Sequence, residues 1–210
     1  MESTLPTKNW PDNNRISMGR ESANLEGLNI LLGVSGGVSA YKAVDLASKL
    51  TAAGANLKTI MTENACQLIM PKSFEAVTGE QVYTSIWSSS GDFKISHVNL
   101  VDWADMVVVA PATANIIGKV AGGICDDLLS TTLCVCWQKP ALMAPAMNNN
   151  MWENPAVQRN VKAIQEAGFK LTGPQEGRLA CGDVGAGRMT EPAEIIRDIE
   201  QIASQIKKKN

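Results

Sequence analysis

Two side chains in this sequence stand out because they are suited to moving protons. His97 is the only histidine among 210 residues, which limits imidazole chemistry to one residue per chain and excludes a metal site made of several histidines. Cys181 lies among glycine and polar residues, whereas most of the other four cysteines sit in apolar context. An ordinary surface or core histidine and a plain buried thiol are the alternatives, and the two residues alone leave them open.

A glycine-rich turn follows the first apolar run of the chain. The run 28–34 ends in Ser35-Gly36-Gly37, and a stripe of apolar residues at helical spacing follows it. Backbone N–H groups at such a strand-to-helix turn can hold a phosphate. The turn lacks the full G-x-G-x-x-G pattern and no acidic residue ends the second strand, so a mononucleotide such as FMN fits better than NAD. A tight turn that binds nothing is the equally weighted alternative.

Two further turns carry hydroxyl and amide side chains directly after apolar runs. Thr113 and Asn115 follow the run 105–110, and Asn148 follows the run 141–144. Ligands bind at the carboxyl ends of strands in open parallel sheets, so these side chains are candidates for a binding site. Helix capping by the threonine and an ordinary asparagine-rich turn are the alternatives.

The elements that must position these residues alternate between strand and helix. Strands are predicted at 28–34, 55–61, 105–110, 141–144 and 169–172, and helices at about 40–53, 114–120, 126–137, 155–167 and 195–206. This alternation predicts an α/β protein with a single-domain, Rossmann-like (flavodoxin-like) doubly wound parallel sheet. Residues 71–91 show no regular pattern. The segment 173–190, with five glycines, is predicted to be a functional flap, and residues 1–27 a flexible N-terminal tail before a domain at 28–206.

Composition and charge narrow the class of protein. The 19 basic and 21 acidic residues give a net charge of −2, without the basic surface that a duplex nucleic-acid binder needs. The longest apolar run is far shorter than the ~20 residues that cross a bilayer, and no apolar signal segment begins the chain. We therefore expect a cytoplasmic protein without nucleic-acid or membrane partners, whose five cysteines are reduced.

These motifs, in this order, resemble the flavin-containing cysteine decarboxylases over nearly all of 28–206. The matching elements are Pro-Ala-Thr-Ala-Asn at 111–115, the histidine before Trp103-Ala104-Asp105, Pro-x-Met-Asn-x-x-Met-Trp at 145–152, and the flap residues Ala180-Cys181-Gly182-Asp183 with Gly187-Arg188-Met189. The sequence departs from the family between the histidine and Trp103. Relatives often carry an acid and basic residues there, and this chain has Asn99, Val101 and Asp102.

The resemblance implies FMN as the cofactor and assigns roles to particular residues. FMN is assigned to Gly36, Gly37, Val38, Thr62, Glu63, Asn64, Thr113, Ala114, Asn115 and Ala146. Asn148, Arg178 and Ala180 are assigned to the substrate, His97 is the base, and Cys181 is the acid. The resemblance also implies a homo-oligomer, a trimer or an assembly of trimers, for which exposed Met147, Met151 and Trp152 would suit an interface, and a phosphopantothenate–cysteine ligase as a further partner.

The implied reaction is the decarboxylation of 4′-phosphopantothenoylcysteine to 4′-phosphopantetheine in coenzyme A biosynthesis. Loss of CO₂ alone leaves a carbanion without an electron sink, so oxidation of the thiol to a thioaldehyde by FMN must precede it. Cys181 then donates a proton as the electrons return. Two alternatives are an oxidative decarboxylase of a peptide C-terminal cysteine, which stops at the enethiol, and a non-catalytic FMN-binding regulatory protein.

Overall fold

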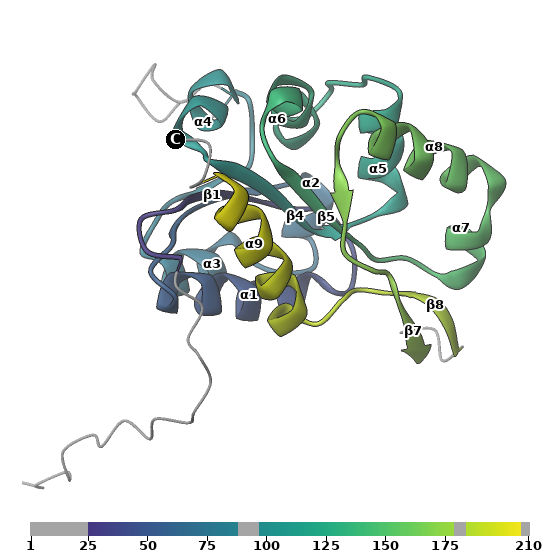
Figure 1. The fold of residues 1–210 in the computed structure, drawn as a ribbon, viewed down its shortest axis with the longest axis horizontal. Coiled ribbons are helices and arrows are strands. Elements are labelled where there is room, and N and C mark those ends of the chain that lie inside the picture. Colours follow the sequence, from purple (N-terminus) through teal and green to yellow (C-terminus); the bar gives the residue numbers. More distant parts are fainter. Residues whose placement is uncertain (1–24, 88–96, 179–183, 207–210) are drawn as a thin grey trace, which may run out of the picture.

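The structure, a computed structural model, describes residues 25–87, 97–178 and 184–206, and its centre is one parallel sheet (Figure 1). The strand order is β3-β2-β1-β4-β5-β6, and every neighbouring pair is parallel. The strands are β1 (Asn29–Val34), β2 (Asn56–Met61), β3 (Val82–Tyr83), β4 (Met106–Ala112), β5 (Ala141–Pro145) and β6 (Lys170–Leu171). The order reverses between β1 and β4, which confirms the predicted doubly wound fold.

Helices cover both faces of the sheet (Figure 1). One face carries α1 (Ala40–Ala52), α3 (Pro71–Thr78) and α9 (Pro192–Ile206); the other carries α4 (His97–Trp103), α5 (Ala114–Ala121), α6 (Leu128–Val135) and α8 (Pro155–Glu166). The short helices α2 (Glu63–Cys66), η1 (Cys136–Gln138) and α7 (Asn149–Glu153) lie in connections. Within the described ranges, none of these helices has the length and apolar character needed to cross a membrane.

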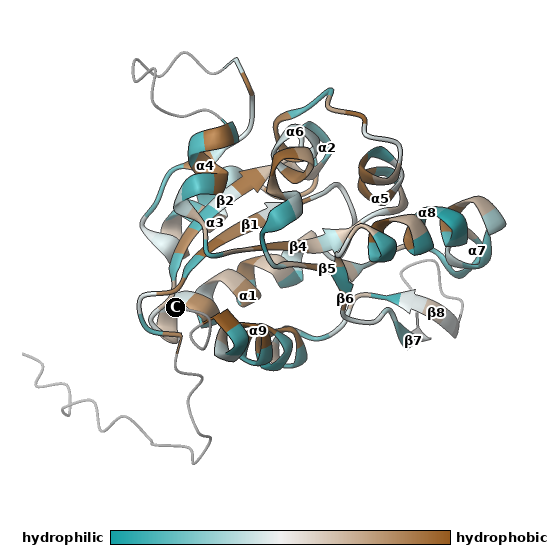
Figure 2. Cartoon of the chain, turned by 45° about the horizontal axis from the view of Figure 1, so that its top comes forward, coloured by the Kyte–Doolittle hydropathy of each residue, from teal (hydrophilic) through white to brown (hydrophobic). Residues whose placement is uncertain are grey.

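The central strands β1, β4 and β5 are mostly apolar (Figure 2), and they lack alternation because both of their faces are buried. All seven residues of β4 are buried. Along β1, Ile30 and Leu32 pack in the cluster under α1 and α9, while Leu31 packs in the cluster under α4, α6 and α8. Two apolar layers therefore hold the sheet rigidly, and the turns at its edges are free to carry polar side chains.

A β-hairpin occupies much of the glycine-rich segment 173–190. Strands β7 (Gln175–Arg178) and β8 (Val184–Arg188) pair antiparallel and stand apart from the main sheet (Figure 1). The Met147 N–H donates a hydrogen bond of 2.9 Å to the Gly187 carbonyl, which fastens β8 to the turn after β5. The hairpin thus has a defined base next to Asn148.

Two expectations from the sequence need correction, one on the segment 71–91 and one on where the packed domain begins. Residues 71–91 contain the helix α3, which begins at a proline and ends at Gly79 in the left-handed conformation. The packed part of the chain also includes residues that were assigned to the tail: Leu25 is buried, and its N–H donates to the Ala53 carbonyl at 3.0 Å. Residues 1–24 lie outside the described residues.

Candidate functional site

A pocket of about 940 Å³ lies at the carboxyl edge of the sheet. Turns after β1, β2, β4 and β5 build it, so it lies at the point where the strand order reverses, which is where ligands bind in this type of fold. The pocket is lined by all the residues assigned to the cofactor, Gly36, Gly37, Val38, Thr62, Glu63, Asn64, Thr113, Ala114, Asn115 and Ala146, together with Asn148. The structure therefore brings eleven of the predicted site residues together.

The two central turns are joined by a buried serine. Ser35 Oγ donates a hydrogen bond of 2.8 Å to the Pro111 carbonyl and accepts one of 3.0 Å from the Thr113 N–H. The turn after β2 lies directly against the turn after β1. A Cβ on Gly36 would lie 2.4 Å from Asn64 Cβ, which is too close for any side chain. Only glycine fits there, so the three turns form one preorganised wall of the pocket.

The amino end of α1 opens into this wall without a side-chain cap. Ser39 makes no capping hydrogen bond, and the first turn holds no acidic residue. The Ala40 and Lys42 N–H groups donate to the Gly37 and Ser39 carbonyls at 2.9 Å each, and the first N–H groups of a helix together carry partial positive charge. The end of a 13-residue helix beside two glycines is thus suited to an anionic group such as a phosphate.

The other polar turn residues serve as helix caps as well as pocket lining. Thr62 accepts from the Ala65 N–H at 3.2 Å, Thr113 from the Ile116 N–H at 3.5 Å, and Asn148 from the Asn150 N–H at 2.8 Å. Helix capping is therefore enough to account for a hydroxyl or amide at these three positions, and it does not exclude that the same side chains bind a ligand. All three residues also line the pocket, which capping alone does not require.

A charged network at the pocket rim was missed by the sequence analysis. Glu191 pairs with Lys42 at 2.8 Å and also with Arg188, and both cations line the pocket. The hydrogen bond from Lys42, and then that from Arg188, lower the pKa of Glu191. A signal was available, because Arg188 stands in the flap motif and Lys42 lies one turn into the helix that follows the glycines.

A third cation in the lining is Lys119, on α5. Its ammonium lies 2.6 Å from a carboxylate oxygen of Asp126 and 2.6 Å from one of Asp127. Burial alone would lower the pKa of Lys119, but the hydrogen bonds to the two aspartates outweigh it and raise the pKa. Its position four residues after Asn115, on the same side of α5, was the available signal.

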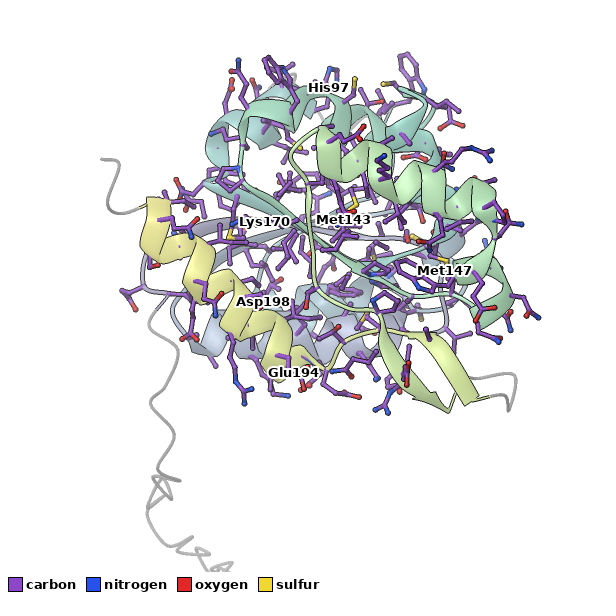
Figure 3. The ribbon with its side chains drawn as sticks, turned by 45° about the vertical axis from the view of Figure 1, so that its right-hand side comes forward. His97, Met143, Met147, Lys170, Glu194 and Asp198 are labelled. Carbon is purple, nitrogen blue, oxygen red and sulfur yellow. The ribbon has the colours of Figure 1, made fainter. Side chains whose placement is uncertain are left out.

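Among the predicted site residues that the structure describes with their side chains, His97 does not line the pocket of its own chain. His97 begins α4, is half-buried, and lies well away from the turn that carries Met147 (Figure 3). Arg178 ends β7, and Ala180 and Cys181 lie outside the described residues. The structure thus separates the predicted base from the predicted cofactor site within one chain.

The apolar residues expected at an interface are only partly exposed. Met151 is exposed, but Met147 and Trp152 are half-buried and pack against the core cluster under α4, α6 and α8. At the pocket, Val38, Tyr41 and Leu68 are exposed as well as Met151, while Met70, Trp87, Val98, Ile124 and Trp137 are exposed away from it.

Replacing Gly187 by alanine should detach the hairpin from the pocket. Gly187 has φ +143°, and an added Cβ would lie 2.2 Å from the Met147 carbonyl oxygen. We expect ligand binding to fall far more than overall stability, as measured by titration and thermal unfolding. Gly79→Ala is the matched control, because Gly79 also has positive φ but nothing within 4 Å, so it should lose about 1 kcal/mol of stability and keep binding. Equal losses in both variants would contradict the close approach.

Comparison with known proteins gives relatives at both the sequence and the structure level. The chain is 49% identical over 177 residues to the coenzyme A biosynthesis bifunctional protein CoaBC of Bacillus subtilis, covering 84% of this chain and 43% of that protein. It spans less than half the length of the curated relatives it matches.

Two solved structures share the fold over most of their length. A mutant of PPC decarboxylase in complex with pantothenoylaminoethenethiol superposes with a TM-score of 0.76 at 33% identity, covering 85% of this chain and 100% of that one. The FMN binding protein AtHal3 gives a TM-score of 0.74 at 34% identity, covering 86% and 98%. Residues 18–204 match the family described as Flavoprotein, and the chain therefore belongs to the flavoprotein family.

Proposed function

We propose that this chain catalyses, in the cytoplasm, the FMN-dependent decarboxylation of 4′-phosphopantothenoylcysteine to 4′-phosphopantetheine in coenzyme A biosynthesis. The observation that carries the proposal is the single pocket that gathers the ten residues assigned to FMN and Asn148 at the switch point of the sheet. The similarity to CoaBC and to PPC decarboxylase supports it. Because CoaBC is bifunctional and longer, we propose a phosphopantothenate–cysteine ligase as a partner.

The residues present fit a flavin mononucleotide. The uncapped end of α1 beside Gly36 and Gly37 suits one phosphate, while Val38, Leu68 and Met151 offer apolar surface for a ring system. The chemistry that FMN supplies is a reversible two-electron oxidation of the cysteine part of the substrate, which provides the electron sink that loss of CO₂ requires.

The chain's own residues would bind the substrate and move its protons. Asn148, at the start of α7 and facing the pocket, binds the substrate carboxylate or amide. His97 accepts a proton as the thiol is oxidised, and Cys181 donates one to the enethiolate. The solved complex of PPC decarboxylase is a cysteine-to-serine mutant that holds an enethiol, which supports a thiol acting only in the second half of the reaction.

Released cofactor provides a direct test. The purified protein should be yellow, and denaturation should release FMN rather than FAD, because one mononucleotide-sized phosphate turn is present. Chromatography of the released flavin against both standards decides between them. A colourless protein that FMN does not reconstitute would contradict the proposal.

His97 lies far from the pocket of its own chain, and this is explained if the His97 side chain of one copy reaches the pocket of a neighbouring copy. The pocket rim exposes Val38, Tyr41 and Met151, and the start of α4 exposes Val98 beside His97. These are two different surfaces, so a contact between them is head-to-tail, and it forms a closed ring where the rotation between copies closes. We propose a trimer, or an assembly of trimers, in which His97 of one copy serves the pocket of the next.

Mixed oligomers test this sharing. His97→Asn and Cys181→Ser subunits, each inactive in complete turnover, should regain activity when co-expressed, because a pocket with an intact thiol can then meet an intact histidine. Random assortment makes about a quarter of the sites complete. Light scattering should give a trimer or a multiple of it. An active monomer, or mixtures without activity despite proven co-assembly, would contradict the shared site.

A further inference from the structure

Two exposed thiols lie on neighbouring segments of the chain beside the pocket. Cys125 lies in the loop between α5 and α6, Cys134 lies on α6, and both are free and exposed. The Thr131 hydroxyl lies 3.2 Å from the Cys125 carbonyl oxygen, so the loop folds back along α6. Cys134 follows Thr131 by three residues and faces the same side of the helix. A hydrogen bond with the Cys134 thiol raises the pKa of Cys125.

The other described cysteines have different surroundings. Cys136 is fully buried, its thiol contacts the Leu133 carbonyl at 3.3 Å, and burial raises its pKa to about 12. Cys66 is half-buried, and burial raises its pKa too. Among the described residues, only Cys125 and Cys134 combine exposure with a neighbouring thiol. An apolar sequence context therefore goes with burial at Cys136 and with exposure at Cys134.

We propose that Cys125 and Cys134 form a redox modification site that closes reversibly into a disulfide. Oxidised glutathione is a sufficient oxidant. One thiolate attacks it, forming a mixed disulfide and releasing one glutathione thiolate; the second cysteine then displaces the other glutathione. The two cysteines together lose two protons and two electrons, and the glutathione disulfide is reduced to two thiols. Reduced glutathione reverses the reaction.

The site is coupled to the pocket through the residue that follows Cys125. Asp126 and Asp127 both bind Lys119, and all three line the pocket. A disulfide holds its sulfur atoms about 2 Å apart, closer than a hydrogen bond does, so closure draws Cys125 toward α6 and shifts Asp126 relative to Lys119. Closure should therefore loosen ligand binding in the pocket, a consequence that rests on the proposed FMN site.

Thiol mapping of the complete protein tests the bond itself. The protein is equilibrated in glutathione buffers of increasing oxidised fraction, its free thiols are alkylated, and it is cleaved before aspartate. Cleavage at Asp126 or Asp127 separates Cys125 from the peptide 127–182, and fragmentation of the linked peptides tells which of its cysteines, Cys134, Cys136 or Cys181, is bonded. We expect linked peptides joining Cys125 to Cys134, loss of two hydrogens, and full recovery on reduction. Cys66→Ser should behave like the wild type, and Cys134→Ser should leave Cys125 as a glutathione adduct.

Three outcomes would overturn the proposal: both thiols alkylated at every buffer ratio, a stable glutathione adduct on wild-type Cys125, or a bond from Cys125 to another cysteine. The effect on the pocket is measured separately, as a several-fold rise in the Kd for FMN in oxidised wild type that Cys134→Ser lacks. If the bond forms and the Kd is unchanged, the coupling to the pocket is wrong. If reduced protein binds no FMN, the proposed function fails while the mapping result stands.

Discussion

His97→Asn should abolish CO₂ release while FMN stays bound. Asparagine keeps a hydrogen-bonding side chain but cannot accept a proton, and loss of a general base costs about 100- to 10,000-fold in rate. His97 is not among the residues that line the pocket of its own chain, so the flavin spectrum and the mass of the oligomer should match the wild type. CO₂ release from 4′-phosphopantothenoylcysteine measures the effect. Turnover near the wild-type rate would show that His97 is not the base and has no catalytic role.

Cys181→Ser should stop the reaction halfway. A hydroxyl is a far weaker acid than a thiol, so the enethiolate should form but should not be protonated, and it should accumulate. Under anaerobic conditions we expect about one CO₂ per active site, flavin that stays reduced, and a product lighter than phosphopantetheine by two hydrogens.

Cys134→Ser is the matched control for this experiment. It removes an exposed thiol that does not line the pocket, and under reducing conditions it should turn over normally. If Cys181→Ser also makes phosphopantetheine at the normal rate, this thiol is not the proton donor. If it releases no CO₂ although FMN and substrate bind, the division of the reaction into two halves is wrong.

The sheet and its turns were predictable because their physical causes are local. A strand buried on both faces must be apolar throughout, as β4 is, and a turn that admits only glycine, as at Gly36, must show glycine. The helix α3 escaped notice because Phe74 is its only buried residue in the described structure, which leaves no apolar stripe to recognise. The hairpin β7–β8 is rich in glycine and packs little apolar surface, so it lacks the alternation that marks a strand.

The parts of the site that could not be predicted depend on contacts between distant elements. Glu191 binds Lys42 although 149 residues separate them in the sequence, and the motifs that mark Lys42 and Arg188 do not reveal that both cations share this carboxylate. The exposure of Cys134 is a similar case, because its sequence neighbours are apolar and only the packing of α6 decides which side chains face the sheet. The sequence shows which residues share one side of a helix, but it does not show which residues of different helices are in contact.

Anaerobic mixing of the holoprotein with 4′-phosphopantothenoylcysteine tests the central claim most directly, with flavin absorbance, CO₂ and product mass followed in the same reaction. The proposed function predicts flavin absorbance that falls and returns within each turnover, about one CO₂ per substrate consumed, and phosphopantetheine as the product without any added oxidant. CO₂ accompanied by flavin that stays reduced and an enethiol product would show the oxidative decarboxylase instead. Bound FMN with no spectral change and no CO₂ would show a non-catalytic flavin-binding protein and contradict the account.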